Sequence, residues 1–308
     1  MASNFNREIS ELGELQDQLT KTNTVLQVIY QPFIQTGRAL LTFRKDTATI
    51  YYKGRQLCNM QYRLKGELPY TPTIYNHFLP VIRSKTLSGC AEKKNYSERQ
   101  YQQETQGNST FVSILPEILD NIEKDMDDEA FQVSAFYRFS PMVSGNNSDV
   151  ILLDIEAAFA EHGKKTDRID MVLYHTKEQQ LIFVEVKRLS DGRLYVKPGS
   201  TDPAEIIGQM NDYKLRLSNE KVQIKEQYNH VIDQYNRLAG KNIPLIGDKD
   251  HLLGLLVVEC TKEACFKKAD AFPKKEAADN SDIKVYNYGQ TKNMTAGTLL
   301  NIYKAFSK

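Results

Sequence analysis

The chain has 308 residues, of which 41% are hydrophobic and 26% charged, a composition typical of a globular protein that buries one large core or one core plus a smaller module. The 40 basic and 39 acidic residues nearly cancel, so any phosphate-binding surface must be local rather than general. The longest apolar run, residues 252–258, is far shorter than the ~20 residues of a membrane span. We therefore expect no membrane partner. Four cysteines and an N-terminus without an apolar signal core indicate reduced thiols and a cytoplasmic location.

The N-terminal region predicts a helix followed by short strands. Leu12, Leu15 and Leu19 have the spacing of one helical face, and residues 39–63 contain three β-like runs separated by turn residues. Between residues 38 and 65 there are seven basic residues and one acidic residue, with tyrosines among them. This pattern is typical of a nucleic-acid groove, with Lys53 and Arg55 as candidate contacts. The alternative is a solvated β face whose tyrosines fill the core.

We interpret residues 1–105 as an N-terminal helix plus a small antiparallel β module with a nucleic-acid-binding or assembly role, and residues 106–308 as the main domain. Residues 85–110 are polar and predict a linker or long loop. A helix is predicted over residues 111–131, interrupted near Pro116.

Residues 150–188 predict a three-stranded antiparallel meander with turns near Gly163 and Glu178. Paired residues of a hairpin lie at equal distances from its turn, which places Asp170 opposite Glu185 and Glu156 opposite Asp170. Lys187 follows Glu185 by two residues and shares its face. Three carboxylates and a lysine therefore converge, with Asp154 as the alternative to Glu156.

Apolar neighbours indicate that these strands are buried, and several buried carboxylates are costly unless a cation compensates them. Carboxylate oxygens are the ligands that Mg²⁺, Mn²⁺ and Ca²⁺ prefer. A lysine beside such a site could orient a water or stabilise charge on a phosphate. The same face carries Arg168, for which we expect a salt bridge to one of the acids.

Asp170 followed by Glu185-Val186-Lys187 resembles the D…(D/E)-x-K signature of the PD-(D/E)xK nuclease superfamily, with Ile169 in place of the proline. The resemblance implies an α/β fold with an αβββαβ core, a mixed sheet flanked by helices, in the order predicted here. It also implies that Asp170, Glu185 and the carbonyl of Val186 bind Mg²⁺ or Mn²⁺ and that Lys187 assists the attacking water. The hairpin register adds Glu156 to the metal ligands.

The next predicted helix starts with Asp202 as N-cap, Pro203 at its first position and Glu205 closing a capping box. Within it Gln209 and Tyr213 share one face and resemble the Q-x-x-x-Y element of the RecB-like branch. The resemblance implies that both approach the DNA backbone, where Lys214 and Arg216 add positive charge.

Some RecB-like nucleases bind an iron–sulfur cluster, but Cys58, Cys90, Cys260 and Cys265 form no C-x-x-C pair, and we expect no cluster. The chain has no P-loop, so a helicase or ATPase partner would be a separate chain, and a homo-oligomer is the other partner considered. A long helical stretch is expected over residues 203–238, a buried parallel strand over 252–259, then a last strand (283–289) and a helix (295–306).

The sequence thus predicts a Mg²⁺- or Mn²⁺-dependent nuclease, acting on DNA rather than RNA, with single strands or ends favoured and a role in repair, recombination or defence against foreign DNA. The rival hypothesis is a non-catalytic nucleic-acid-binding or assembly protein that retains the nuclease fold. A buried acidic cluster argues against that rival, because binding alone does not need one.

Overall fold

The computed structural model describes residues 6–20, 24–62, 69–83, 94–125, 128–159, 167–197, 199–259 and 283–308. These residues form two compact units, each built around its own five-stranded sheet. The first unit holds residues 147–233 and 242–308, and the second holds 6–146 and 234–241. The contacts therefore divide the chain after residue 146 and not at the predicted position between residues 105 and 106. No helix in these ranges is long and apolar enough to cross a membrane.

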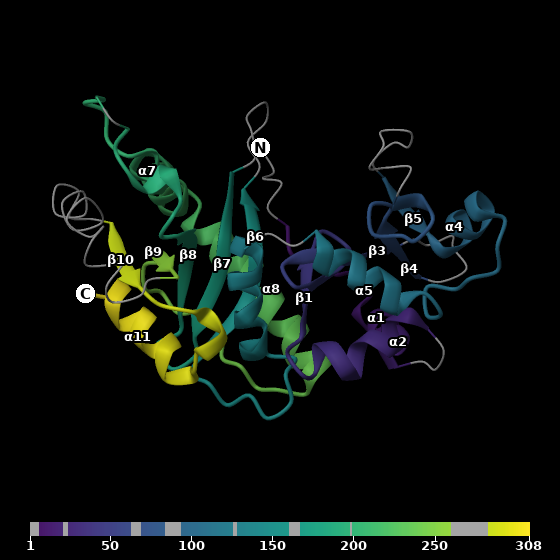
Figure 1. The fold of residues 1–308 in the computed structure, drawn as a ribbon. Helices are drawn as coiled ribbons and strands as arrows, with labels where there is room; N and C mark the ends of the chain where they lie inside the picture. The colour runs from purple at the N-terminus through teal and green to yellow at the C-terminus, as the bar shows by residue number, and fades with distance from the viewer. Residues whose placement is uncertain are drawn as a thin grey trace. The chain divides into compact units, whose positions relative to one another are not determined.

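The sheet of the first unit is mixed, in the order β10-β9-β8-β7-β6 (Figure 1). Strands β6, β7 and β8 are antiparallel neighbours, whereas β8, β9 and β10 are parallel. The predicted α/β class, the antiparallel meander and the parallel strand after it are confirmed. The strands are β6 (Val150–Phe159), β7 (Asp167–His175), β8 (Gln180–Arg188), β9 (Leu252–Val258) and β10 (Lys284–Asn287).

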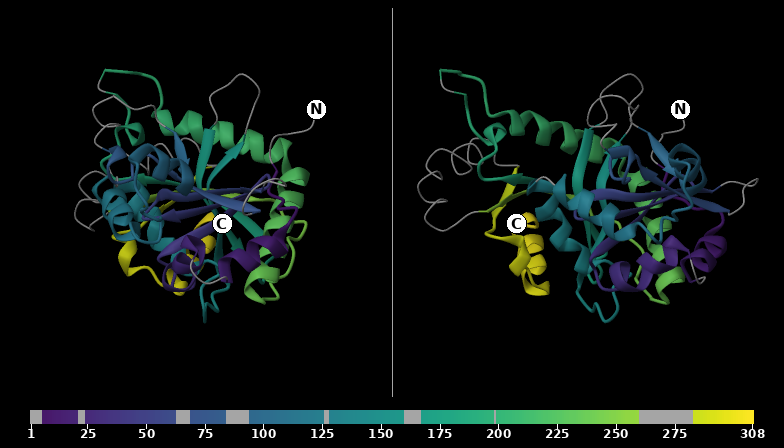
Figure 2. Two further views of the ribbon diagram at one scale, coloured as in Figure 1. Left: turned by 90° about the vertical axis from the view of Figure 1, so that its right-hand side faces the viewer. Right: turned by 45° about the vertical axis from the view of Figure 1, so that its right-hand side comes forward.

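Helices cover both faces of this sheet (Figure 2). Helix α11 (Ala296–Phe306) packs on one face, where the ring centroids of Tyr303 and His175 lie 4.3 Å apart. Helices α7 (Glu205–Asn219) and α8 (Lys221–Ala239) contact the opposite face, the one to which Phe183 and Glu185 belong. Two short 3₁₀ turns, η3 (Gly192–Leu194) and η4 (Thr291–Asn293), complete the described elements of this unit.

The second unit contains an antiparallel meander in the order β1-β2-β3-β4-β5. Two-residue turns at Lys45-Asp46 and Lys53-Gly54 connect its first three strands, and all four residues have positive φ, as the hairpin turns that match strand twist require. The predicted β module is confirmed and extended by two strands. The strands are β1 (Ala39–Arg44), β2 (Thr47–Tyr52), β3 (Arg55–Tyr62), β4 (Tyr70–Tyr75) and β5 (Asn95–Ser97).

One face of this second sheet forms a core with the helices of its unit, and the three leucines predicted to share a helical face are buried there. Gln18 ties α1 to β4 through two hydrogen bonds, from its amide to the Tyr70 carbonyl (3.0 Å) and from the Tyr70 N–H to its oxygen (2.7 Å). The last residues of α8 belong to this unit, where the Tyr235 hydroxyl donates to the Leu41 carbonyl. The helical elements are α1 (Leu12–Thr20), α2 (Val25–Ile29), η1 (Tyr30–Ile34), α4 (Glu98–Thr105), α5 (Leu115–Lys124), α6 (Asp128–Ser134) and η2 (Ala135–Phe139).

Three local predictions are wrong. Residues 95–105, expected in a linker, form β5 and α4, because Ser97 and Gln100 make a capping box that starts the helix. Pro116 is the second residue of α5 and does not interrupt a helix, since a proline fits the first turn. Helix α7 starts at Glu205, after Ala204 and not after Asp202.

The predicted helical stretch over residues 203–238 is confirmed, as two helices, α7 and α8, separated at Glu220.

Gly254 fixes how closely α11 approaches β9, and it provides a test of the packing. A Cβ at this position would lie 2.4 Å from atoms of the Phe306 ring. We expect Gly254→Ala to lower the free energy of unfolding by about 1–3 kcal/mol, because the ring must move away. Urea unfolding followed by circular dichroism measures the change.

Gly208→Ala is the matched control, because a Cβ at this position in α7 meets nothing within 4 Å. Alanine should raise the stability there by roughly 0.5–1 kcal/mol, since glycine is unfavourable inside a helix. Equal destabilisation by both substitutions would contradict the packing argument.

Candidate active site

The candidate site lies where strands β7 and β8 part. Their pairing runs from His175–Gln180 to Met171–Val184, whereas β7 stays paired with β6 down to Asp167 and β8 stays paired with β9 up to Arg188. One more step of this register would place Asp170 opposite Glu185, as the sequence predicted. The strands separate at this point, and the gap between them holds polar side chains in place of backbone hydrogen bonds.

The ammonium group of Lys187 is surrounded by oxygen atoms from three residues. It forms a close ion pair with Glu185 Oε1, donates to the Val186 carbonyl at 2.9 Å, and lies 3.7 Å from Asp170 Oδ2. The side chains of Lys187 and Glu185 are only 3% and 2% exposed, while that of Asp170 is 26% exposed. The three oxygens therefore meet at one cation, and Asp170 lies on the side that solvent reaches.

Two side chains hydrogen-bond backbone groups of β7 and β8 where the strands separate. Asp170 Oδ2 accepts a hydrogen bond from the Val186 N–H at 2.7 Å. The Tyr213 hydroxyl donates to the Arg168 carbonyl at 2.6 Å. Because buried backbone groups left unsatisfied are costly, these two contacts stabilise the open end of the strand pair.

Gln209 connects helix α7 to the site. Its amide group lies 2.8 Å from Glu185 Oε1 and 2.7 Å from the Tyr213 hydroxyl, so one helical turn supports both the acid and the strand end. The structure thus brings Gln209 and Tyr213 together with Asp170, Glu185 and Lys187. On the same helix Lys214 is exposed and Arg216 is half-buried.

Glu156 lies on β6, and its neighbours Ile155 and Ala157 pair with Met171 and Ile169, which confirms the predicted register of Glu156 opposite Asp170. Its φ of 48° is left-handed, a conformation rare for a residue other than glycine. The Glu156 carboxylate, 41% exposed, lies 3.4 Å from the Arg168 guanidinium, and the expected salt bridge of Arg168 is confirmed. The turn around Gly163 lies outside the described residues.

Asp154, the alternative to Glu156, is buried on the same strand. It accepts hydrogen bonds from the Tyr228 hydroxyl (3.2 Å) and from the Ile155 N–H (2.9 Å). Sequence analysis did not find this contact with α8, because no local pattern links Asp154 to a residue 74 positions away. Among the residues that the structure describes, no three His, Cys, Asp or Glu side chains form a group that could hold a metal ion.

The donor set of the site nevertheless suits a hard divalent cation. Two carboxylates and a carbonyl, all oxygen ligands, already converge on a positive charge. The residues that would hold Mg²⁺ or Mn²⁺ are therefore Asp170, Glu185 and the carbonyl of Val186. Glu156 and Asp154 lie on the neighbouring strand.

The loop after β8 adds a second charged pair. Arg193 binds Asp191 in a two-pronged arrangement, with Nε 3.0 Å from Oδ1 and Nη2 2.6 Å from Oδ2. Burial would raise the pKa of Asp191, but hydrogen bonds from Arg193 outweigh it and hold the pKa below its usual value, with a further contribution from Lys187. The positive charge of Lys187 therefore acts on a third carboxylate, one that sequence analysis did not single out.

Lys53 and Arg55, the candidates from the N-terminal module, belong to the second unit and make contacts within it. Lys53 lies over the Phe131 ring at 5.5 Å from its centroid, and Arg55 donates to the Asp125 carbonyl at 3.0 Å. Cys58 is a buried free thiol whose pKa burial raises to about 12. The other three cysteines lie outside the described residues.

The coupling between Lys187 and Glu185 can be measured without any assumption about function. We expect Lys187→Met to lower the free energy of unfolding by about 3–5 kcal/mol, because it leaves a buried carboxylate without its cation. Glu185→Gln should also destabilise, whereas the double variant should cost clearly less than the sum of the two. Urea unfolding of the four proteins gives the coupling energy, and additive costs would show that the pair is not coupled.

Comparisons of the chain with protein-family models, with curated proteins and with solved structures found no match. Its function must therefore be inferred from its own residues and their contacts.

Proposed function

We propose that the chain is a metal-dependent nuclease with a PD-(D/E)xK core, and that Asp170, Glu185 and Lys187 carry its chemistry. The observation that supports this proposal most is the meeting of Asp170, Glu185 and the Val186 carbonyl at one cation. A charged strand end that served only the fold would be paired at the surface. Here two of the three charged side chains are buried, and Asp170 extends to solvent.

Each residue of the site has a distinct role in this proposal. Asp170, Glu185 and the carbonyl of Val186 would hold Mg²⁺ or Mn²⁺, with Glu156 as a further ligand. Such an ion, when bound, would acidify a water and neutralise charge on the scissile phosphate. Lys187 donates a hydrogen bond to the attacking water or to the phosphate oxygens, whose negative charge grows in the transition state. Gln209 and Tyr213 keep Glu185 and the Arg168 carbonyl in position.

The substrate we propose is DNA in preference to RNA, and single strands or ends in preference to a specific sequence. Lys214 and Arg216 on α7 supply positive charge on the helix that supports Glu185. The near-neutral chain has no motif that reads base pairs, and the RecB-like resemblance points to the processing of ends. Repair, recombination and defence against foreign DNA are the settings in which such an activity operates.

Incubation with labelled single- and double-stranded DNA and RNA in Mg²⁺, Mn²⁺ or EDTA tests the proposal. We expect cleavage with either metal and none in EDTA. Asp170→Asn, Glu185→Gln and Lys187→Ala should each lower the rate at least ~100-fold, because each removes a group that acts on the transition state. Glu178→Gln and Lys177→Ala, exposed changes in the β7–β8 turn, are the matched controls and should cut normally.

Binding of Mn²⁺, followed by calorimetry, separates the roles of the three residues. Asp170→Asn and Glu185→Gln should weaken binding, whereas Lys187→Ala should retain it, because the ammonium group competes with the metal for the same oxygens. Cleavage that survives Lys187→Ala or ignores EDTA would rule out this mechanism. A folded wild-type chain that binds DNA without ever cutting it would favour the non-catalytic hypothesis.

A further inference from the structure

The second unit presents a sheet face on which polar side chains follow one another across all five strands. Direct cross-strand neighbours form one row, Thr42–Thr49–Asn59–Thr73–Ser97, and a second row runs Arg44–Thr47–Gln61–Thr71. Thr42 and Thr49 are buried, whereas the other members of both rows are half-buried or exposed. The opposite face of the same strands carries buried side chains such as Phe43, Ile50, Met60 and Ile74. With strands ~4.8 Å apart, the part of the first row that is not buried, Asn59 to Ser97, extends over roughly 10 Å.

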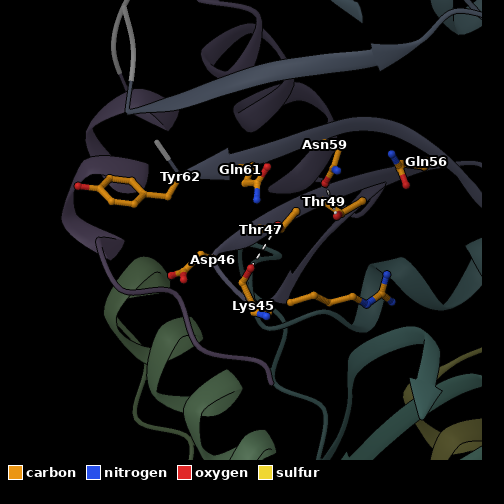
Figure 3. A pocket seen from close by; sticks show the side chains of 9 residues that line it. Lys45, Asp46, Thr47, Thr49, Gln56, Asn59, Gln61 and Tyr62 are labelled. Atoms are coloured by element: carbon orange, nitrogen blue, oxygen red, sulfur yellow. Dashed lines mark hydrogen bonds between the residues drawn. The ribbon is translucent and has the colours of Figure 1, made fainter. Parts of the chain in front are cut away.

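This face carries two open, shallow hollows. One hollow of about 530 Å³ lies over β1, β2 and β3, and another of about 580 Å³ lies over β3, β4, β5 and the start of α4. Asn59 and Gln61 line both, so the hollows adjoin along β3. Figure 3 shows the side chains of β2 and β3 around the first hollow. Each hollow is in the size range of ligand sites.

The chemistry of the lining is unusual for a solvated surface, which commonly mixes charges of both signs. Among the described residues that line the two hollows, amides and hydroxyls dominate, with three cations (Arg44, Lys45 and Arg99) and one acid, Asp46. The Asp46 carboxylate already accepts hydrogen bonds from the Ser10 N–H (3.0 Å) and hydroxyl (2.7 Å). The surface therefore has a local positive excess in a chain whose charges otherwise nearly cancel.

Two contacts hold part of this lining in place. The Thr49 hydroxyl donates to Asn59 Oδ1 at 2.9 Å, and the Thr73 hydroxyl donates to the Asn59 carbonyl at 3.0 Å. Gln61, Arg99 and Gln100 are exposed. At the corner next to Tyr62, burial and the charges of Glu11, Glu14 and Asp46 raise the pKa of that tyrosine, so acids mark this border of the surface.

We propose that this polar sheet face binds a single-stranded nucleic acid. The proposal rests on the proposed function, because the bound strand is taken to be the substrate of the nuclease site. Arg and Lys side chains attract phosphates, and Thr, Ser, Asn and Gln are the neutral side chains that hydrogen-bond phosphate and sugar oxygens. Amides also pair with base edges, which are accessible on both donor and acceptor sides only when the strand is unpaired. Lys53 and Arg55 lie at the turn between β2 and β3, at the other end of β2 from Lys45, and line neither hollow.

Fluorescence anisotropy of the full chain with a labelled single strand of DNA, in EDTA, tests the surface without cleavage. Gln61→Glu and Arg99→Glu should each weaken binding at least ~5-fold, and the double variant more. Arg99→Glu should also reduce the slope of log affinity against log salt by about 0.7. Gln16→Glu on α1 and Lys124→Glu on α5 repeat the same charge changes at exposed positions outside the face, and should bind as wild type does.

Competition with unlabelled RNA and with duplex DNA identifies the form of strand that the face prefers, and stronger competition by the duplex would overturn the proposal. So would a wild-type chain that binds no single strand, a double variant that binds normally, or equal losses in the controls. Because binding is measured in EDTA, the outcome is independent of cleavage. A chain that binds through Gln61 and Arg99 but never cuts would refute the nuclease activity and support this surface.

Discussion

The ion pair between Lys187 and Glu185 is the interaction on which the first unit depends most. A buried carboxylate is tolerable only next to a cation, and a buried ammonium only among oxygen acceptors, so each side chain requires the other. The pair occupies the place where β7 and β8 stop exchanging backbone hydrogen bonds. Asp170 accepts a hydrogen bond from the Val186 N–H there, and Tyr213 donates one to the Arg168 carbonyl. Gln209 of helix α7 donates to Glu185 Oε1, the oxygen that also contacts Lys187. A proposed catalytic site and a local exception to sheet pairing are thus one arrangement.

Much of this arrangement could be predicted from the sequence because it depends on local rules. Hairpin symmetry about the 176–179 turn gave the Asp170–Glu185 register, and the two-residue period of a strand gave the shared face of Lys187. The four-residue spacing of Gln209 and Tyr213 predicted that they share one face of a helix, and in α7 the two side chains contact each other beside the site. These inferences need only distances along the chain, and the structure agrees with them.

The parts that failed depend on contacts between distant segments. The sequence alone could not show that Arg55 donates to the carbonyl of Asp125, or that Asp154 meets Tyr228 on α8. The predicted domain boundary assumed that a polar stretch separates two modules, whereas residues 95–105 add a strand and a helix to the second sheet. The polar sheet face was also missed, because alternate residues of five strands align only after the register is known.

The end of helix α8 determines whether the two units could be separated by cutting the chain. The second unit is discontinuous in sequence, because residues 234–241 belong to it together with residues 6–146. Gln234 donates a hydrogen bond to the Arg7 carbonyl and Tyr235 to the Leu41 carbonyl. Lys241 donates to the carbonyls of Val143 and Asn146. A fragment that ended at residue 146 would lose all of these contacts. Gene fusion or recombination that cut the chain between its two sheets would therefore leave the N-terminal part incomplete. The two units are therefore expected to be inherited together.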